Sequence, residues 1–524
     1  MTEMAEADVV IVGSGATGSL LAARLGTAGR KVVVLEGGPP RKLDQMYSST
    51  IWSRDLKWAG PPARVAGANP VTFPFEAGWG QGGSALHHYA CWFRLHEEDF
   101  KFATVHGTGF DWPIEYRDLQ PYYDALQKEV GLSGDKDQEI WRPPGEPYPM
   151  PPQPVFRQAQ LLAEGFAKQG LKTAPLPMAI NSIPYKGRPA CLQDGWCDAG
   201  CPTGALANPI VIFGEAMKKA GVETRYNAFV SRILTMSSGR RAKSVEYFEA
   251  DGTKKTIDAK LVILAAFAVQ TPRILLNSAN DRHPRGLANS SGRVGRYFTP
   301  HAAVNLYGMF AEETENHMGR TGGQLMCQDD YSPRPERGFV GGYTWRIGAA
   351  LKLADLGGLA PARVALFGAR LKTFMEKAST HLATLSALIT NQPSFENAIT
   401  LTSEKDDNGI PLARLTNTLS ADAKKAAQGA IKQGLAIFKT AGANEAWAAP
   451  LRTEHMMGGT MMGEDPAQSV TDGYGRTHDV ENLFISGPGL MPSVGAVNPT
   501  FTASALAART ADHIVGNWAA FAAN

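Results

Sequence analysis

The 524-residue sequence lacks the marks of membrane, fibrous and nucleic-acid-binding chains. Its longest apolar stretch, LVILAAFAV from Leu261 to Val269, is far shorter than the roughly 20 residues of a membrane-spanning helix. The formal net charge is only +2, and no basic stripe or lysine-rich tail is present, so we expect no nucleic-acid partner. The segment before the first apolar run, MTEMAEAD, lacks the basic and apolar parts of a signal peptide, so none is expected. No internal repeat is present.

Cysteine is scarce as well. The five cysteines are Cys91, Cys191, Cys197, Cys201 and Cys327. An odd number with three of them clustered excludes a disulfide framework. Cys91 and Cys327 stand alone, and we interpret each as a small buried apolar residue.

What remains is the composition of an ordinary globular protein. Hydrophobic residues make up 44% and charged residues 19%, and the length allows buried cores for two or three domains. Irregular covering loops are expected over 39–83 and a surface linker over the proline-dense 140–155. Short strands are expected within 222–270, and helices include 421–442 and a long final one from about Thr500 to Phe521.

The N-terminal region has the pattern strand, glycine turn, helix, strand. The apolar run Val9–Val12 precedes Gly-Ser-Gly-Ala-Thr-Gly, which is a GxGxxG motif, and KVVVLE follows the helical segment and ends at Glu36. Gly13 permits the tight turn, Gly15 lets a pyrophosphate approach the backbone, and Gly18 lets helix and strand pack closely. The free N–H groups of the helix favour phosphates, and Glu36 can accept a hydrogen bond from a ribose hydroxyl. The motif predicts a dinucleotide site, and the alternative is a plain glycine-rich turn.

The central cysteines form the pattern Cys191-x5-Cys197-x3-Cys201, followed by proline. The ending Cys-x3-Cys-Pro is like that of ferredoxin sequences, and three thiolates can hold three irons, so a [3Fe–4S] cluster is expected. One alternative is a zinc site, which normally takes four ligands and would need Asp194 or Asp198 to complete it. The other alternative is three unbound thiols.

Several longer segments together resemble the glucose–methanol–choline (GMC) oxidoreductase family. They are GWGQGGSALHH around Gly82–Ser84, the segment Leu261–Ala279, the segment VGRYFTPH ending at His301, and the C-terminal NLFISGPGLMPSVGAVNPTFTASALAART. The matches run from residue 8 to about residue 514. The sequence is most similar to the branch of flavoprotein large subunits of bacterial fructose, gluconate, sorbitol and glucose dehydrogenases, and its C-terminal region also resembles pyranose oxidases and glucoside 3-dehydrogenases.

The resemblance implies an α/β fold with a Rossmann-like FAD-binding domain interleaved with an α+β substrate domain that carries an antiparallel sheet. Residues 1–300 would be mainly the FAD-binding domain, with the cysteine insertion at about 185–210. Residues 301–450 would be mainly the substrate domain, and residues 451–524 would return to the FAD domain with the catalytic residues. The candidate cofactor-binding residues are Gly13, Gly15, Ala16, Gly18, Glu36, Gly82, Gly83, Ser84, His87, Val230, Ala265, Asn498, Pro499 and Thr500.

The resemblance also implies a catalytic pair, His455 in TEHMMGG and Asn498 in GAVNPTFT. Hydride leaves a carbinol carbon only as its hydroxyl proton is taken, and a neutral imidazole can be that base. Asn498 would orient the hydroxyl against N5 of the flavin. The alternatives are a satisfied core histidine and a turn residue before Pro499. Glu454 stands where the similar branch has asparagine, and it would bind sugar hydroxyls or pair with Arg452.

His87 lies where pyranose oxidases attach the flavin covalently. The similar branch has Trp-His-Trp here, whereas this chain has Leu86-His87-His88. We therefore expect His87 to pack against the flavin without a covalent bond, with covalent attachment as the alternative.

The resulting expectation is an FAD-dependent dehydrogenase that oxidises a secondary or anomeric hydroxyl of a sugar, glycoside or polyol. Because a cluster carries one electron at a time, electrons would pass to an external acceptor such as a cytochrome c. The alternatives are an oxidase that forms peroxide and an electron-transfer module with an inactive alcohol site. A small subunit and a cytochrome would be partners, with a periplasmic or membrane-associated location through a partner, or else the cytoplasm.

Overall fold

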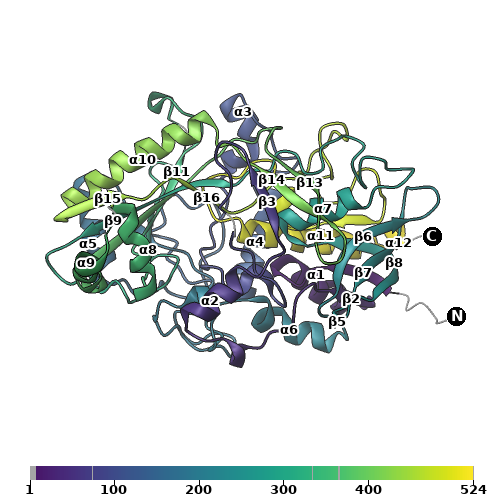
Figure 1. The fold of residues 1–524 in the computed structure, drawn as a ribbon, viewed down its shortest axis with the longest axis horizontal. Helices are drawn as coiled ribbons and strands as arrows, with labels where there is room; N and C mark the ends of the chain where they lie inside the picture. The colour runs from purple at the N-terminus through teal and green to yellow at the C-terminus, as the bar shows by residue number, and fades with distance from the viewer. Residues whose placement is uncertain (1–6, 73–74, 333, 364–365, 523–524) are drawn as a thin grey trace.

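The computed structural model describes residues 7–72, 75–332, 334–363 and 366–522. Its elements form two large sheets and one small sheet with helices around them (Figure 1). In the view of Figure 1, elements from the two ends of the chain, including α1, β2 and α11, lie together on the right, while β9, α8, α9 and α10 lie on the left. The predicted α/β fold is confirmed.

The first sheet has seven strands within the described ranges, and it holds the glycine turn. Its parallel part runs in the order β5 (Glu223–Arg225), β2 (Val32–Leu35), β1 (Ala7–Val12), β8 (Lys254–Leu264) and β17 (Leu483–Ile485). The strands β1, β2 and β17 are apolar and buried, and α1 (Ala16–Thr27) packs on β1 and β2. Helix α1 also packs against α6 (Pro209–Lys219) and α11 (Thr500–Gly516), and α4 (Tyr116–Val130) packs against α11.

Strand β8 belongs to two kinds of pairing. Its second half pairs in parallel with β1, and its first half pairs antiparallel with β7 (Ala242–Phe248), which continues to β6 (Phe229–Thr235). The strands expected within 222–270 are therefore present. They extend the sheet on the side opposite β5.

The second sheet is antiparallel and lies beside the first. Its order is β15 (Glu445–Ala448), β9 (His301–Met309), β12 (Leu382–Ile389), β11 (Tyr343–Ile347), β10 (Leu325–Cys327) and β4 (Ala174–Pro175), and β16 (Arg452–Glu454) also pairs with β9. Helix α10 (Ala421–Thr440) packs on β9 and β12 and against α5 (Arg157–Lys168), which gives this sheet its own apolar core. The helices α8 (Leu353–Arg363) and α9 (Gly368–His381) pack on each other at its edge.

The remaining elements are short. The strands β13 (Ala398–Lys405), β14 (Pro411–Thr416) and β3 (Ala63–Ala66) form the small sheet, and α7 (Phe267–Asn277) packs on it. The expectation of irregular loops over 39–83 is wrong in part, because helix α2 (Thr50–Lys57) and strand β3 lie within that range. Helix α3 (Phe102–His106) follows after it. The single final helix that we predicted is wrong in one respect: α11 ends at Gly516, and α12 (Trp518–Ala522) follows after Asn517, whose side chain bonds the His513 carbonyl. None of the helices in the described ranges has the length and apolar character to cross a bilayer.

Candidate functional site

A cavity of about 600 Å³ lies at the carboxyl edge of the parallel sheet, which is where open α/β sheets bind ligands. The ends of β1, β2 and β8 open into it, and so do the first turn of α11 and the residues after β16. All but two of the candidate cofactor-binding residues line this cavity, and the two that do not are Gly18 and Gly82. The cavity also includes His455 and Asn498, so it joins segments from both ends of the chain.

The three glycines of the first turn have separate structural reasons. Gly13 has φ +99°, and a Cβ there would lie 2.6 Å from the Ala265 carbonyl oxygen. A Cβ on Gly18 would lie 2.0 Å from the Gly13 carbonyl oxygen, so only glycine lets helix α1 pack against the turn. Gly15 differs, because a Cβ there would meet no protein atom within 4 Å. Its backbone faces open space at the start of α1, where N–H groups attract an anion.

Glu36 organises this end of the cavity. One carboxylate oxygen accepts from the Ser14 N–H at 2.9 Å and the Ser14 hydroxyl at 2.8 Å, and the other accepts from the N–H groups of Gly38 and Gly80 at 3.0 and 3.2 Å. The carboxylate thus ties three loops together while it lines the cavity. A ribose hydroxyl would either donate to the same carboxylate beside these four donors or replace one of them.

The second glycine loop lies directly on the first. The Gly82 N–H donates to the Ser14 carbonyl at 3.1 Å, and a Cβ on Gly83 would be 3.3 Å from the Gly15 Cα. The Ser84 hydroxyl accepts from the Gly78 N–H at 3.0 Å. These contacts fix the loop from Gly78 to Ser84 as one wall of the cavity.

His87 lines the same cavity and is 3% exposed, and neither of its ring nitrogens has a hydrogen-bond partner within the described chain. Burial lowers its pKa to about 3, so the ring is neutral. The neighbouring His88 differs, because its Nε2 bonds the Ala207 carbonyl at 2.8 Å. A buried imidazole without partners points to a polar ligand beside it.

His455 and Asn498 meet on the cavity wall. The Asn498 Nδ2 lies 3.0 Å from the His455 Nε2, and the Asn498 Oδ1 is buried without a partner among the described residues. His455 directly follows strand β16 and has φ +53°, a left-handed conformation that is uncommon outside glycine. Burial, followed by the neighbouring His301, lowers the pKa of His455 well below its usual value, so the imidazole is neutral.

A charged wall lies beside this pair. Glu454 accepts from Arg346 at 3.0 Å and also pairs with Arg452, so the expectation of a Glu454–Arg452 pair is met and a second arginine joins it. The two arginines hold the pKa of Glu454 far below its usual value against the opposing effect of burial. Glu76 accepts from the Tyr89 hydroxyl at 3.3 Å, and both residues line the cavity.

The three clustered cysteines lie outside this cavity. Their thiols are close enough that Cys191 and Cys201 both help to raise the pKa of Cys197, although burial is the main cause of its rise to about 12. The cationic side chains Arg188 and Arg320 are close enough to interact with them, and burial lowers the pKa of each arginine to about 10.

No group of three or more Cys, His, Asp or Glu side chains among the described residues is arranged to hold a metal ion. Asp198, which was considered as a zinc ligand, instead pairs with Lys57 at 2.8 Å and Lys352 at 2.9 Å. Asp194 bonds the Trp196 N–H at 3.2 Å. These side chains are therefore not preassembled as a metal site. Cys91 and Cys327 are both buried, as expected.

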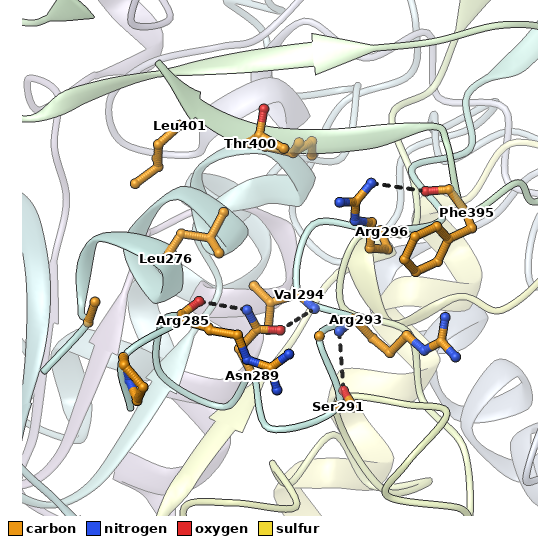
Figure 2. A pocket seen from close by; sticks show the side chains of 14 residues that line it. Leu276, Arg285, Asn289, Ser291, Arg293, Val294, Arg296, Phe395, Thr400 and Leu401 are labelled. Atoms are coloured by element: carbon orange, nitrogen blue, oxygen red, sulfur yellow. Dashed lines mark hydrogen bonds between the residues drawn. The ribbon is translucent and has the colours of Figure 1, made fainter. Parts of the chain in front are cut away.

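A second cavity, of about 670 Å³, shares no lining residue with the first. Figure 2 shows Arg285, Arg293 and Arg296 on its wall, together with Phe395. The Asn289 amide donates to the Arg285 carbonyl at 2.7 Å, and its oxygen accepts from the Val294 N–H at 3.1 Å. These two hydrogen bonds hold the loop that forms this wall. None of the predicted site residues lies there.

Comparison with known proteins agrees with this geometry. Two models of the GMC oxidoreductase family match residues 7–303 and 393–507. The chain is 30% identical to the fructose dehydrogenase large subunit of Gluconobacter japonicus, over 98% of this chain and 99% of that protein. It is 31% identical to 2-methyl-1,2-propanediol dehydrogenase of Mycolicibacterium austroafricanum, over 98% and 96%, and 27% identical to the gluconate 2-dehydrogenase flavoprotein of Pantoea cypripedii, over 96% and 92%.

Solved structures show the same fold. Pyridoxine 4-oxidase from Mesorbium loti matches with a TM-score of 0.67 at 17% identity, over 97% of this chain and 99% of that one. Formate oxidase of Aspergillus oryzae matches with a TM-score of 0.68 at 14% identity, over 99% of each chain.

The chain therefore belongs to the GMC oxidoreductase family. It is an FAD-dependent oxidoreductase that acts on CH–OH donors, and the open space at Gly15, the unpartnered His87 and the free Asn498 oxygen all fit that cofactor.

Sequence reasoning missed two residues of the site, His301 and Arg346. His301 is the last residue of the segment VGRYFTPH and the first residue of strand β9, and a histidine at the start of an apolar run was the available signal. Arg346 lies inside strand β11 with no local motif, so only the sheet pairing brings it to Glu454.

Proposed function

We propose that this protein is a dehydrogenase that oxidises a secondary or anomeric hydroxyl of a sugar, glycoside or polyol. The observation that carries the proposal is the contact of 3.0 Å between His455 Nε2 and Asn498 Nδ2, on the wall of the cavity that begins at the glycine turn. A base and an amide that face one cavity can bind one hydroxyl group between them.

In the proposed reaction the substrate hydroxyl donates its hydrogen bond to His455 Nε2, and the Asn498 amide N–H donates to the substrate oxygen. The hydroxyl proton moves to His455 as the carbon loses hydride, which carries both electrons, and a carbonyl forms. FAD, when bound, supplies the hydride acceptor. The carboxylate of Glu454, next in sequence, favours the positive charge that His455 gains.

The charged wall supports a neutral, hydroxyl-rich substrate. Arg346 and Arg452 are balanced by Glu76 and Glu454, so the wall offers many donors and acceptors with little net charge. Such a surface exchanges hydrogen bonds with hydroxyl groups and gives no strong preference to an anion or a cation. The name of one relative supports a hydroxyl-rich substrate, since fructose is a sugar. The diol in the name of another relative carries one primary and one tertiary hydroxyl group, so it supports an alcohol substrate in general.

We further propose that Cys191, Cys197 and Cys201 hold a [3Fe–4S] cluster and that the chain works with a small subunit and a cytochrome c. One relative, the fructose dehydrogenase large subunit, is by name part of an assembly, which supports a partner subunit. The cationic Arg188 and Arg320 favour thiolates at this position. A location in the periplasm or at a membrane, through a partner, goes with such an assembly. Because the thiols are not preassembled as a metal site, no catalytic step above depends on the cluster.

The test is turnover of the purified FAD-loaded protein with a dye acceptor and a panel of free sugars, glycosides, polyols and simple diols. Dye reduction with hydroxyl-rich substrates, without peroxide in air, supports the proposal. Peroxide at the rate of substrate loss would instead identify an oxidase. A flavin that no substrate in the panel reduces, but that accepts electrons from dithionite, would identify an electron-transfer module.

A further inference from the structure

His301 links both halves of the catalytic pair. It is the first residue of β9 and is fully buried, at 0% exposed. Its Nε2 lies 2.9 Å from the Val494 carbonyl oxygen and 3.2 Å from that of Gly495, on the loop that leads to Asn498. Its Nδ1 lies 3.1 Å from the Nδ1 of His455.

These contacts decide where the ring protons are. A carbonyl oxygen only accepts, so His301 Nε2 must carry the hydrogen. A neutral His301 then has a bare Nδ1, which can only accept. The contact between the two Nδ1 atoms needs one hydrogen, and that hydrogen must come from His455. A neutral His455 with hydrogen on Nδ1 has a bare Nε2, the atom that lies beside Asn498.

We propose that His301 is a positioning residue that fixes His455 in the tautomer with a free Nε2 and so points the base at the substrate. The inference rests on the proposed role of His455 as the base. It goes further, because it states which nitrogen acts and which residue selects it. In the substrate-free protein the Asn498 amide, 3.0 Å from Nε2, also favours a bare Nε2, because an amide N–H only donates. In the proposed reaction this N–H donates to the substrate oxygen instead, so His301 is then the neighbour that keeps the proton on Nδ1. Without His301 the proton would be distributed over both nitrogens, and part of the molecules would present an N–H to the substrate hydroxyl.

The surroundings of the two rings favour the neutral form of both His301 and His455. Burial lowers the pKa of His301 to about 4 and that of His455 as well. The charged groups that face the two rings are Glu454, which opposes this lowering for both, Arg346, which adds to it for both, and Arg452, which adds to it for His455. His301 also pairs in register with Glu454 across β9 and β16, so the backbone holds the two rings at this distance.

A second role for His301 would be purely mechanical, since its Nε2 ties the loop at Val494 to the sheet. Two substitutions separate these roles. In His301→Asn, an amide oxygen near the position of Nδ1 still accepts from His455, but the bond to Val494 is lost. In His301→Gln, the amide N–H still reaches the Val494 carbonyl, but no acceptor remains opposite His455.

Tautomer control predicts that His301→Gln lowers the rate of flavin reduction at saturating substrate in proportion to the molecules with hydrogen on Nε2, by about three- to tenfold, while KM changes little. His301→Asn should stay within about twofold of the native rate. FAD content and the midpoint of thermal unfolding check that both variants fold. Equal loss in both variants, or a larger loss in His301→Asn, would overturn the inference and leave only the mechanical role.

The direct readout is nitrogen NMR on FAD-loaded protein labelled with ¹⁵N-histidine, with His455→Gln and His301→Gln used for assignment. We expect the His455 Nε2 signal of an unprotonated ring nitrogen in the native protein and in Asn498→Ala, and a mixed signal when His301→Gln is added to Asn498→Ala, because neither neighbour then selects the tautomer. A protonated Nε2 in the native protein would overturn the inference. This result does not depend on turnover: if His455→Ala keeps the native rate, the proposed base is wrong, whatever the tautomer.

Discussion

The residues of the cavity and those of the cysteine loop, residues 191–201, can both be recognised in the sequence. The two regions differ in whether the protein chain, without a bound ligand, already holds their side chains in the arrangement that a ligand needs. Gly13 and Asn498 are far apart in sequence but line one cavity, whereas Cys191, Cys197 and Cys201 lie within a short segment and form no metal-holding group among the described residues. Nearness in sequence therefore does not predict a finished site here.

The difference follows from what fixes each position. The cavity groups are held by sheet pairing and by backbone hydrogen bonds, such as those of Glu36 and His301, which form without any ligand. The hydrogen bonds of two of the thiols are local: Cys191 accepts from the Gln193 N–H at 3.4 Å, and Cys201 lies 3.2 Å from the Thr203 hydroxyl. Thiolate ligands are brought to their final geometry by the metal itself, because metal binding and local folding are coupled. This difference can be tested with substitutions in the cavity and with substitutions in the cysteine loop.

The largest effect should come from the cavity side, with His455→Ala. Loss of the base should slow flavin reduction by substrate by about 10²–10⁴-fold, while FAD stays bound because the glycine turn is unchanged. Stopped-flow absorbance of the flavin measures this rate. The matched control is His283→Gln, because His283 bonds the Gly239 carbonyl on a distant turn and should keep the native rate. A His455→Ala rate above half the native one would contradict the assignment of the base.

A glycine pair should separate cofactor binding from folding. Gly15→Ala adds a methyl group into open space that the cofactor would use, so we expect FAD affinity to fall at least about tenfold with little change in the stability of the FAD-free chain. Gly18→Ala adds the same methyl group 2.0 Å from the Gly13 carbonyl oxygen, so the free energy of unfolding should fall by about 1–3 kcal/mol. Flavin fluorescence titration and denaturant unfolding measure the two quantities. Equal stability in both variants would mean that the turn relaxes around Gly18.

The sequence allowed the fold to be predicted well, because strand, glycine turn and helix have strong local patterns and the longer motifs resemble a family. It also placed His455 and Asn498, which the structure brings together. It could not supply His301 or Arg346 as neighbours of the site, since their contacts depend on β9 and β11 pairing with strands far along the chain. The domain boundaries at about residues 300 and 450 and the cluster stay predictions.

On the cysteine side, Cys197→Ser should remove iron and acid-labile sulfide from the purified protein and slow transfer to a cytochrome c. It should leave flavin reduction by substrate within about twofold, because the thiol lies outside the cavity. Low-temperature electron paramagnetic resonance with iron analysis measures the cluster. The control is Cys327→Ala, a buried cysteine of the second sheet that should keep its iron. Native protein free of iron and sulfide would contradict the cluster. Loss of flavin reduction in Cys197→Ser would mean that the cysteine loop supports the fold of the cavity and does not act as an electron carrier alone.

The smallest effect should be the response of the cavity to acid. The base acts in its neutral form, and the pKa of His455 is lowered by burial, then by His301, with Arg346 and Arg452 adding to this effect and Glu454 opposing it. An ordinary histidine would lose about tenfold of its neutral form between pH 7.5 and 5.5, since its pKa is about 6.5. Here kcat/KM should change less than about twofold over that range, because the imidazole takes a proton only at lower pH. In Glu454→Gln the acid limb should move still lower, since the one group that favours the imidazolium is neutral. An acid limb of the kcat/KM profile centred near pH 6.5 in the native protein would mean that solvent reaches His455 in the working enzyme. The ring would then not be held in the buried, hydrogen-bonded state that distinguishes the cavity from the cysteine loop.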